Sequence, residues 1–300
     1  MEARDVVIIG AGPAGIAAAI QLRRQEISPV VFEQDEVGGL LRNACMVENY
    51  PGFPEGIAGP ELVALMRDHL GRNDVEVRRE RAVSLDYRED RYLLRTAGGG
   101  TICRVAVVAS GTEPRKIPDL AIPDDIMDRV FYEVYPIRDV RYKNIAIVGA
   151  GDAAFDYALN LSRQNEVTVL ARSAAPRCNH RLWEKAASSL HISLMTGIEV
   201  RKAVGRGGKL LLSCSHLRRP GETTVSVDYL VIAVGREPAT HFFTRGLAEQ
   251  SAYLTLRNKL HLIGDVRNGL YRQASISVGN GVEAAMHIAK HLRSEGRINQ

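Results

Sequence analysis

Cysteine is scarce in this chain, and its few cysteines are widely spaced. The 300 residues contain four, at Cys45, Cys103, Cys178 and Cys214, and no two of them lie within three residues of each other. This spacing excludes a CxxC redox pair and the usual zinc-ligand patterns. The eight histidines are also dispersed, so no metal site is expected. We predict four reduced thiols, as is typical of an intracellular protein.

Long apolar runs and strong net charge are missing as well. No apolar run approaches the length of about 18 residues that a membrane helix needs. The first ten residues, MEARDVVIIG, do not have the order of regions found in a signal peptide. The net charge of +4 is too small to indicate nucleic-acid binding. We therefore predict a soluble cytoplasmic protein with neither a membrane nor a nucleic-acid partner.

The amino-terminal segment has the pattern of a complete βαβ unit. An apolar run at 5–9 precedes GAGPAG at 10–15, a helical pattern covers 16–25, and a second apolar run at 29–32 ends at Glu33. Backbone N–H groups and the helix dipole at such a helix start bind pyrophosphate when no side chain blocks them. Gly10 permits the tight turn, Gly12 the close approach of the ligand, and Gly15 the packing of helix on strand. Glu33 is placed to accept hydrogen bonds from a ribose.

A second unit of the same kind begins in the middle of the chain. A strand pattern at 144–148 precedes GAGDAA at 149–154, a helical pattern at 155–163 and another strand pattern at 167–170. This last strand ends at Arg172 instead of an acid, and Arg177 follows nearby. Arginine pairs with the 2′-phosphate of NADP, which a carboxylate would repel, so the pattern favours NADPH over NADH. The alternative is that both arginines are only exposed loop residues.

Each half ends in a similar short sequence, VVASGTEPR at 107–115 and VIAVGREPA at 231–239, which indicates an internal duplication. Further motifs are GGL at 38–40, VENYPGFPEGIAGPEL at 47–62, GDV at 264–266 and YRQASISVGNGVEAA at 271–285. Together with the two glycine turns, these motifs resemble the low-molecular-weight thioredoxin reductases among the pyridine nucleotide-disulfide oxidoreductases. The resemblance covers nearly the whole chain.

The resemblance implies an α/β fold of two Rossmann-like, three-layer dinucleotide-binding domains. The FAD domain would comprise 1–115 and 244–300, and the NAD(P)H domain, 116–243, would be inserted into it. It also implies a homodimer. Asn49 would lie beside the isoalloxazine, Asp265 near the ribityl and phosphate groups, and the backbone of Val83 against adenine. The helix that opens at Gln273 and Ala274 would point its amino end at the flavin, where it stabilises the negative charge of the reduced ring.

The complete set of expected cofactor contacts follows from the two turns and this resemblance. For FAD it comprises Gly10, Gly12, Pro13, Ala14, Gly15, Glu33, Gln34, Gly39, Leu40, Asn49, Val83, Gly111, Gly264, Asp265, Gln273 and Ala274. For NADP it comprises Gly149, Gly151, Asp152, Ala153, Arg172, Arg177 and Gly235.

One stretch departs from the family pattern. Thioredoxin reductases carry a CxxC just before the second glycine turn, whereas residues 131–138 here read FYEVYPIR, with Glu133 and Pro136 roughly where the cysteines would be. Without these thiols no disulfide can relay electrons to thioredoxin. We therefore predict an FAD-dependent NADPH oxidoreductase that passes electrons directly to ferredoxin, flavodoxin or a small organic acceptor. Two alternatives stay open: a thiol or disulfide reductase that uses Cys45, and a non-catalytic flavin-binding redox sensor.

Overall fold

A computed structural model describes residues 2–218, 220–294 and 296 of the chain. Residues 1, 219, 295 and 297–300, some of which belong to the predicted FAD segments, lie outside this description. The chain forms two compact units. Unit 1 comprises Met1–Arg42, Met46–Glu113 and Glu237–Gln300, and unit 2 comprises Asn43–Cys45 and Pro114–Arg236. Among the described residues, no helix is both long and apolar enough to cross a membrane.

Unit 1 is built on a seven-stranded sheet in which the order β3-β2-β1-β6 is parallel. The first half of β6 pairs with β5, and β5 pairs with β4, both in antiparallel orientation. The second half of β6 pairs in parallel with β17. The strands are β1 (Glu2–Ile9), β2 (Val30–Glu33), β3 (Glu76–Arg79), β4 (Ala82–Arg88), β5 (Arg91–Thr96), β6 (Gly99–Val108) and β17 (Leu260–Leu262).

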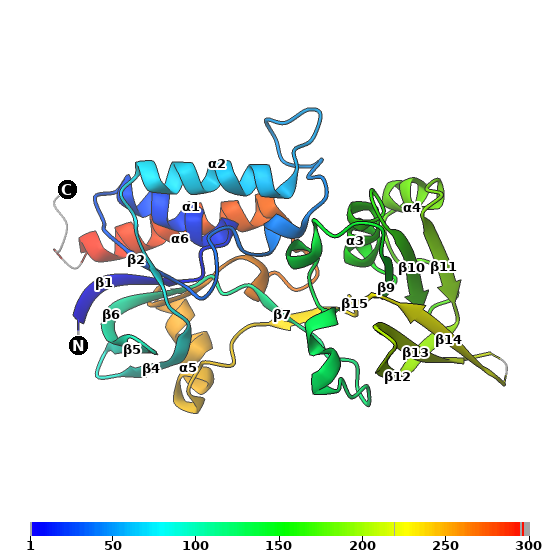
Figure 1. Cartoon of the computed structure of the whole chain (residues 1–300). Coiled ribbons are helices and arrows are strands. Elements are labelled where there is room, and N and C mark those ends of the chain that lie inside the picture. Colours follow the sequence, from blue (N-terminus) through cyan, green and yellow to red (C-terminus); the bar gives the residue numbers. More distant parts are fainter. Residues whose placement is uncertain (1, 219, 295, 297–300) are drawn as a thin grey trace. The chain divides into compact units, whose positions relative to one another are not determined.

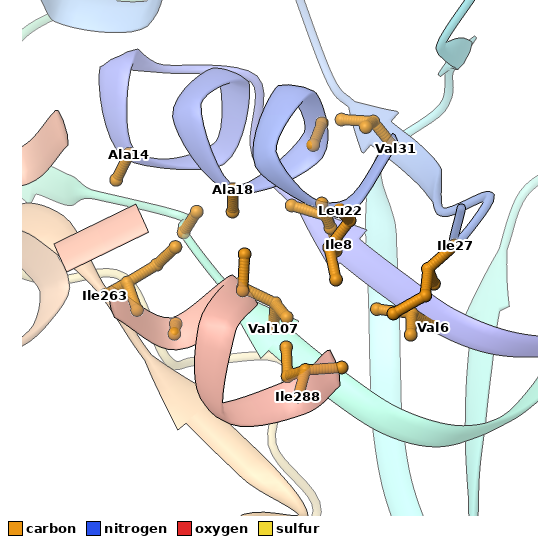
Figure 2. Packing of buried hydrophobic residues seen from close by; sticks show 14 of the residues in the cluster. Val6, Ile8, Ala14, Ala18, Leu22, Ile27, Val31, Val107, Ile263 and Ile288 are labelled. Atoms are coloured by element: carbon orange, nitrogen blue, oxygen red, sulfur yellow. The ribbon is translucent and has the colours of Figure 1, made fainter. Parts of the chain in front are cut away.

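Three helices cover one face of this sheet: α1 (Pro13–Arg23), α2 (Gly59–Arg72) and α6 (Ala274–Ser294) (Figure 1). The first and last of them enclose an apolar core with the sheet. Figure 2 shows Ala14, Ala18 and Leu22 of α1 facing Ile288 of α6, with Val107 of the sheet beside them. All five side chains are almost completely buried, so the core fixes the start of α1 against the carboxyl edge of the sheet.

The other face of the unit 1 sheet has its own core. The helix α5 (Arg245–Leu256) contributes Leu247 and Leu254, and the β4–β5 hairpin contributes Leu85 and Tyr92. Phe242 joins this core, and its carbonyl accepts a hydrogen bond from the backbone N–H of Leu85 at 2.7 Å. These contacts explain why residues 237–243 lie in unit 1, although the resemblance predicted them as part of the inserted NAD(P)H domain, 116–243.

Unit 2 repeats the parallel arrangement in the order β11-β10-β9-β15-β8. Its strands are β8 (Val130–Phe131), β9 (Asn144–Val148), β10 (Glu166–Ala171), β11 (Ile192–Thr196) and β15 (Tyr229–Ile232). The helices α3 (Asp152–Leu161) and α4 (His180–Ala187) pack on one face. The antiparallel strands β12 (Ile198–Arg206), β13 (Lys209–His216) and β14 (Glu222–Val227) cover the other.

The two connections between the units contain the short strands β7 (Thr112–Pro114) and β16 (Arg236–Pro238). Among the described residues, these two strands pair only with each other and with no strand of either main sheet.

The predicted α/β class, with two Rossmann-like parallel sheets, is confirmed. Two predicted helix starts were three residues late: α1 begins at Pro13 and α3 at Asp152. In each case the helix begins directly after the second glycine of the turn, which serves as its N-cap.

Candidate functional site

The first glycine turn joins β1 to α1, and two of its glycines are required by close packing. Gly10 has φ +104°, and a Cβ on it would collide with the carbonyl of Ala109 in the turn after β6. A Cβ on Gly15 would collide with the carbonyl of Gly10. Both positions therefore hold the helix start tightly against the carboxyl edge of the sheet.

Gly12 has the opposite environment, because no atom lies within 4 Å of where its Cβ would be. No side chain caps the start of α1 either, and Pro13 at the first helical position has no N–H to satisfy. The turn thus leaves open space in front of uncapped N–H groups, which is the environment that a pyrophosphate needs. Ala14 and Gly15, which supply the next N–H groups, lie on this first turn of the helix.

Glu33 ends β2 beside this turn, and both of its carboxylate oxygens are held. Oε2 accepts a hydrogen bond from the N–H of Ala11 at 2.7 Å, and Oε1 accepts one from the N–H of Asp35 at 2.9 Å. The residue is only 8% exposed. The predicted ribose-binding carboxylate is therefore fixed next to the glycine turn that is predicted to bind phosphate. Gln34 is exposed, and Gly39 and Leu40 are half-buried, with Gly39 packed close to Gly12.

Residues from the carboxyl-terminal part of the chain meet the same turn. Gly264 has φ +71° and lies against Ala14, and the adjacent Asp265 accepts a hydrogen bond from the Ser277 hydroxyl at 3.2 Å. The start of α6 at Ala274 is reached by Asn49, whose Nδ2 donates to Oε1 of Gln273 at 2.8 Å. The structure thus brings Asn49 and Gln273 together. Gly111 follows β6 with φ +65°, and Val83 lies on β4 with 62% of its surface exposed.

The second glycine turn, between β9 and α3, repeats this design in unit 2. Gly149 has φ +152°, and a Cβ on it would collide with the carbonyl of Ala233. Gly151 again has nothing within 4 Å of its Cβ position, and no side chain caps α3. The third position is the fully buried Ala154. A second uncapped helix start with open space before it is therefore present, and Asp152 and Ala153, both predicted NADP contacts, are its first two residues.

A cavity of about 380 Å³ opens in front of this second turn. Its lining follows the carboxyl ends of the unit 2 strands. Among the lining residues, Gly149 to Ala153 follow β9, Arg172 and Ser173 follow β10, and Gly235 and Arg236 follow β15. The lining also includes Tyr132 after β8, Tyr157 on α3 and Arg177 in the loop before α4. Ligands of doubly wound sheets bind at this edge. The predicted NADP contacts are thereby brought together around one cavity.

The arginines of this cavity are held by neighbouring groups. The Arg172 guanidinium lies 3.6 Å from a carboxylate oxygen of Glu199, and the N–H of Arg177 donates to the carbonyl of Ala150 at 2.7 Å. Asp152 accepts a hydrogen bond from the N–H of Asn179 at 2.8 Å. Arg172 therefore stands at the β10 end of the cavity, where the adenosine half of a dinucleotide binds in this topology, and Arg177 is held through its backbone beside the glycine turn.

Comparison with known proteins agrees with both turns. Residues 4–281 match the pyridine nucleotide-disulphide oxidoreductase family. The chain belongs to this family. It is 32% identical to a thioredoxin reductase from Streptomyces coelicolor over 299 residues, which cover 95% of this chain and 92% of that protein. A thioredoxin reductase from Chlamydia trachomatis is 29% identical and matches over 98% of this chain and all of its own length.

Solved structures give the same result for the fold. A thioredoxin reductase from Lactococcus lactis superposes with a TM-score of 0.87 at 26% identity, covering 97% of this chain and 99% of that one. A bacillithiol disulfide reductase from Staphylococcus aureus has a TM-score of 0.75 at 17% identity, covering 98% and 99%, and shares the fold alone. This oxidoreductase is FAD-dependent, and its cofactors are FAD and NADPH.

The cysteines of this oxidoreductase are all free. Cys103 on β6 and Cys214 on β13 are buried strand residues, and burial raises the pKa of both thiols. Cys178 is half-buried, and burial raises its pKa too. Cys45 lies in unit 2, with its Sγ 3.1 Å from the Arg163 guanidinium, but burial again raises the thiol pKa. All four thiols are therefore less readily ionised than an ordinary cysteine.

Several lining residues escaped the sequence analysis. Ser173 directly follows Arg172 and could have been included by position alone. Tyr157 lies five residues after Asp152 on α3, and Arg236 directly follows Gly235; both line the cavity. Gly281 was also missed, although a Cβ on it would collide with the Ala14 carbonyl at the first turn. The signal for Gly281 was a glycine inside a long helical pattern, which often marks close packing.

Proposed function

We propose that unit 1 binds FAD, that unit 2 binds NADPH, and that electrons leave the flavin for an external acceptor without passing through a dithiol of this chain. The observation that carries the proposal is the pairing of two uncapped glycine turns with a chain in which no two cysteines are spaced as a redox pair. When bound, FAD accepts a hydride from NADPH and releases its electrons to the acceptor.

On the FAD side, the residues of unit 1 bind and orient the dinucleotide. The helix start after Gly12 offers N–H groups to the pyrophosphate, and Glu33 offers a fixed carboxylate to the adenosine ribose. The start of α6 would support the negative charge that the isoalloxazine carries when reduced, and Asn49 is hydrogen-bonded to Gln273 beside this start. These roles need no acid–base side chain.

On the NADPH side, the residues of unit 2 select the coenzyme by charge. Arg172, which follows β10, and Arg177 both line the cavity, and no carboxylate ends that strand as Glu33 ends β2. A 2′-phosphate between two guanidinium groups forms charge-assisted hydrogen bonds. The open space at Gly151 accommodates the pyrophosphate.

The stretch at 131–138 supports a route without thiols. Two residues after the end of β8 it carries Glu133, whose Oε1 lies 3.5 Å from the Arg236 guanidinium. A carboxylate cannot be reduced and reoxidised as a thiol pair can, so this stretch contains no group that can relay electrons from the flavin. The curated relatives are named thioredoxin reductases, and we propose that this chain differs from them in its acceptor.

The acceptor that we propose is ferredoxin or flavodoxin, or else a small organic molecule such as a quinone. The mildly basic charge of the chain suits an acidic carrier protein. GAGDAAFDYALNL at 149–161 resembles ferredoxin- and flavodoxin–NADP reductases of thioredoxin-reductase type. A cytoplasmic homodimer, joined through the FAD unit, is part of the same proposal.

Rapid anaerobic reduction followed by reoxidation tests the proposal and its alternatives. NADPH should bleach the flavin quickly, and ferredoxin, flavodoxin or a quinone should restore its colour, whereas oxidised thioredoxin should not. Cys45→Ser is the matched variant, because serine keeps the size of the side chain and removes the thiol. It should behave as the wild type does.

Two outcomes would contradict the proposal in different ways. Reoxidation by a disulfide substrate that is lost in Cys45→Ser would establish the thiol route instead. A flavin that NADPH does not reduce on the time scale of turnover would favour the redox sensor.

A further inference from the structure

The lining of the unit 2 cavity includes a tyrosine whose hydroxyl no described protein group pairs. Tyr157 is only 8% exposed and lines the cavity, yet its hydroxyl has no hydrogen-bond partner among the described residues. The oxygen is not among the side-chain atoms that are buried without a partner, in contrast to the Tyr92 hydroxyl, so it faces the open space of the cavity and can pair with a ligand there. Burial raises the Tyr157 pKa to about 12, so the group is a neutral hydroxyl that can donate a hydrogen bond.

A charged pair stands beside this tyrosine. The Arg236 guanidinium lies 3.5 Å from Oε1 of Glu133, and the two side chains are 18% and 24% exposed. The other oxygen of Glu133, Oε2, accepts a hydrogen bond from Nδ2 of the buried Asn43 at 3.3 Å. Both carboxylate oxygens are therefore engaged, and Glu133 fixes the guanidinium at the cavity wall. Arg236 and Tyr157 both line the cavity.

The strand order tells which part of a dinucleotide reaches these residues. Adenosine binds at the end of β10, by Arg172, and the pyrophosphate at the start of α3. The remaining half must then extend across the ends of β15 and β8, since these are the next strands along the edge. Arg236 follows β15, and Glu133 follows β8 by one residue after Tyr132.

We propose that Tyr157 and Arg236 bind the nicotinamide mononucleotide half of NADPH, with Glu133 as the positioning residue for Arg236. The Tyr157 hydroxyl donates a hydrogen bond to the ribose, and the Arg236 guanidinium pairs with the phosphate of that half. The inference rests on the proposed function. It gives a coenzyme-positioning role to Glu133, which stands roughly where the resemblance places a redox thiol.

Calorimetric binding to the oxidised holoprotein tests the inference with two ligands: NADP⁺, and adenosine 2′,5′-bisphosphate, which lacks the nicotinamide half. Tyr157→Phe removes one oxygen and should preserve the fold, since that oxygen has no protein partner. It should weaken NADP⁺ binding about 3- to 10-fold, the value of one hydrogen bond, and leave bisphosphate binding unchanged. Arg172→Ala is the matched control at the other end of the cavity and should weaken both ligands.

Glu133→Gln isolates the positioning role, because it keeps the shape and removes the charge that holds Arg236. It should weaken NADP⁺ by a smaller factor than Tyr157→Phe does, again without effect on the bisphosphate. Tyr157→Phe that leaves NADP⁺ binding unchanged, or weakens both ligands equally, would overturn the inference. A wild-type protein that binds neither ligand would instead contradict the proposed function of unit 2.

Discussion

Asp156 on α3 is a carboxylate in an unfavourable place. Burial raises its pKa to about 6, even though the side chain accepts a hydrogen bond from the N–H of Cys45 at 3.2 Å and lies near the Arg163 guanidinium. Its ionised form is therefore less stable in the folded protein than in the unfolded chain. The folded pKa is above the unfolded one, so the protonated group favours folding, and this contribution disappears as the pH rises from about 4 through 6.

Asp156→Asn should consequently stabilise the protein at neutral pH. The amide is never charged and keeps an oxygen that can accept from Cys45. We expect a gain of roughly 1–3 kcal/mol in the free energy of unfolding above pH 6, shrinking as the pH falls towards 4. Denaturant titration across this range measures it. Asp139→Asn, at a carboxylate that is 85% exposed, should change little at any pH, and an Asp156→Asn gain that does not vary with pH would contradict the assignment.

Single residues could be predicted where a backbone motif dictates their chemistry. Glu33 and Arg172 follow from their places at strand ends after glycine turns. Tyr157 and Arg236 could not be found in this way, because their roles depend on which side chains the ends of β15, β8 and α3 bring together. Asn49 and Gln273 were predicted through the family resemblance, and their mutual hydrogen bond is visible only in the structure.

The packing of α1 on α6 depends on one glycine. A Cβ on Gly281 would collide with the carbonyl of Ala14 and lie 2.9 Å from the N–H nitrogen of Ala18. Backbone atoms cannot move aside as a flexible side chain can. The contact therefore couples α6, which carries the predicted flavin-facing start, to the predicted phosphate-binding start of α1.

Gly281→Ala should destabilise the protein although alanine is the better helix former. We expect a loss of at least about 2 kcal/mol in the free energy of unfolding, as in other overpacked cores, together with weaker FAD retention. Gly279→Ala is the control on the same helix, since nothing lies within 4 Å of its Cβ position, and it should stabilise by about 0.5–1 kcal/mol. Equal effects of the two substitutions on the melting temperature would show that the close approach is not needed.

At the scale of elements, both βαβ units were predictable because each contains buried strands around a glycine turn. Three helices, α2, α4 and α5, were not predicted. In α2 and α5 the buried residues are few and their apolar stripes short, with Gly59, Leu62, Val63 and Leu70 buried in α2. Tertiary contacts with the sheet cores stabilise such helices more than their local sequence does. The N-cap of α5, where Thr244 accepts from the Leu247 N–H at 3.4 Å, was a signal that could have been used.

At the scale of the whole molecule, the duplication explains how one architecture holds two dinucleotides. In both units the first glycine has positive φ and packs on a neighbouring turn, and the second faces open space. The units differ at the end of the second strand, where unit 1 has Glu33 and unit 2 has Arg172. The acceptor could not be predicted from the sequence, because the absence of a CxxC excludes one route without specifying another.

An anaerobic titration with NADPH measures how many electrons the protein stores, and this number distinguishes a flavin that acts alone from a flavin coupled to a dithiol. A flavin without a dithiol partner takes up a single hydride, so the absorbance should be fully bleached at about one equivalent of NADPH per FAD. A protein with a working dithiol would take up a further pair of electrons. Bleaching that is complete only at about two equivalents, with two additional thiols appearing in a thiol assay, would contradict the account.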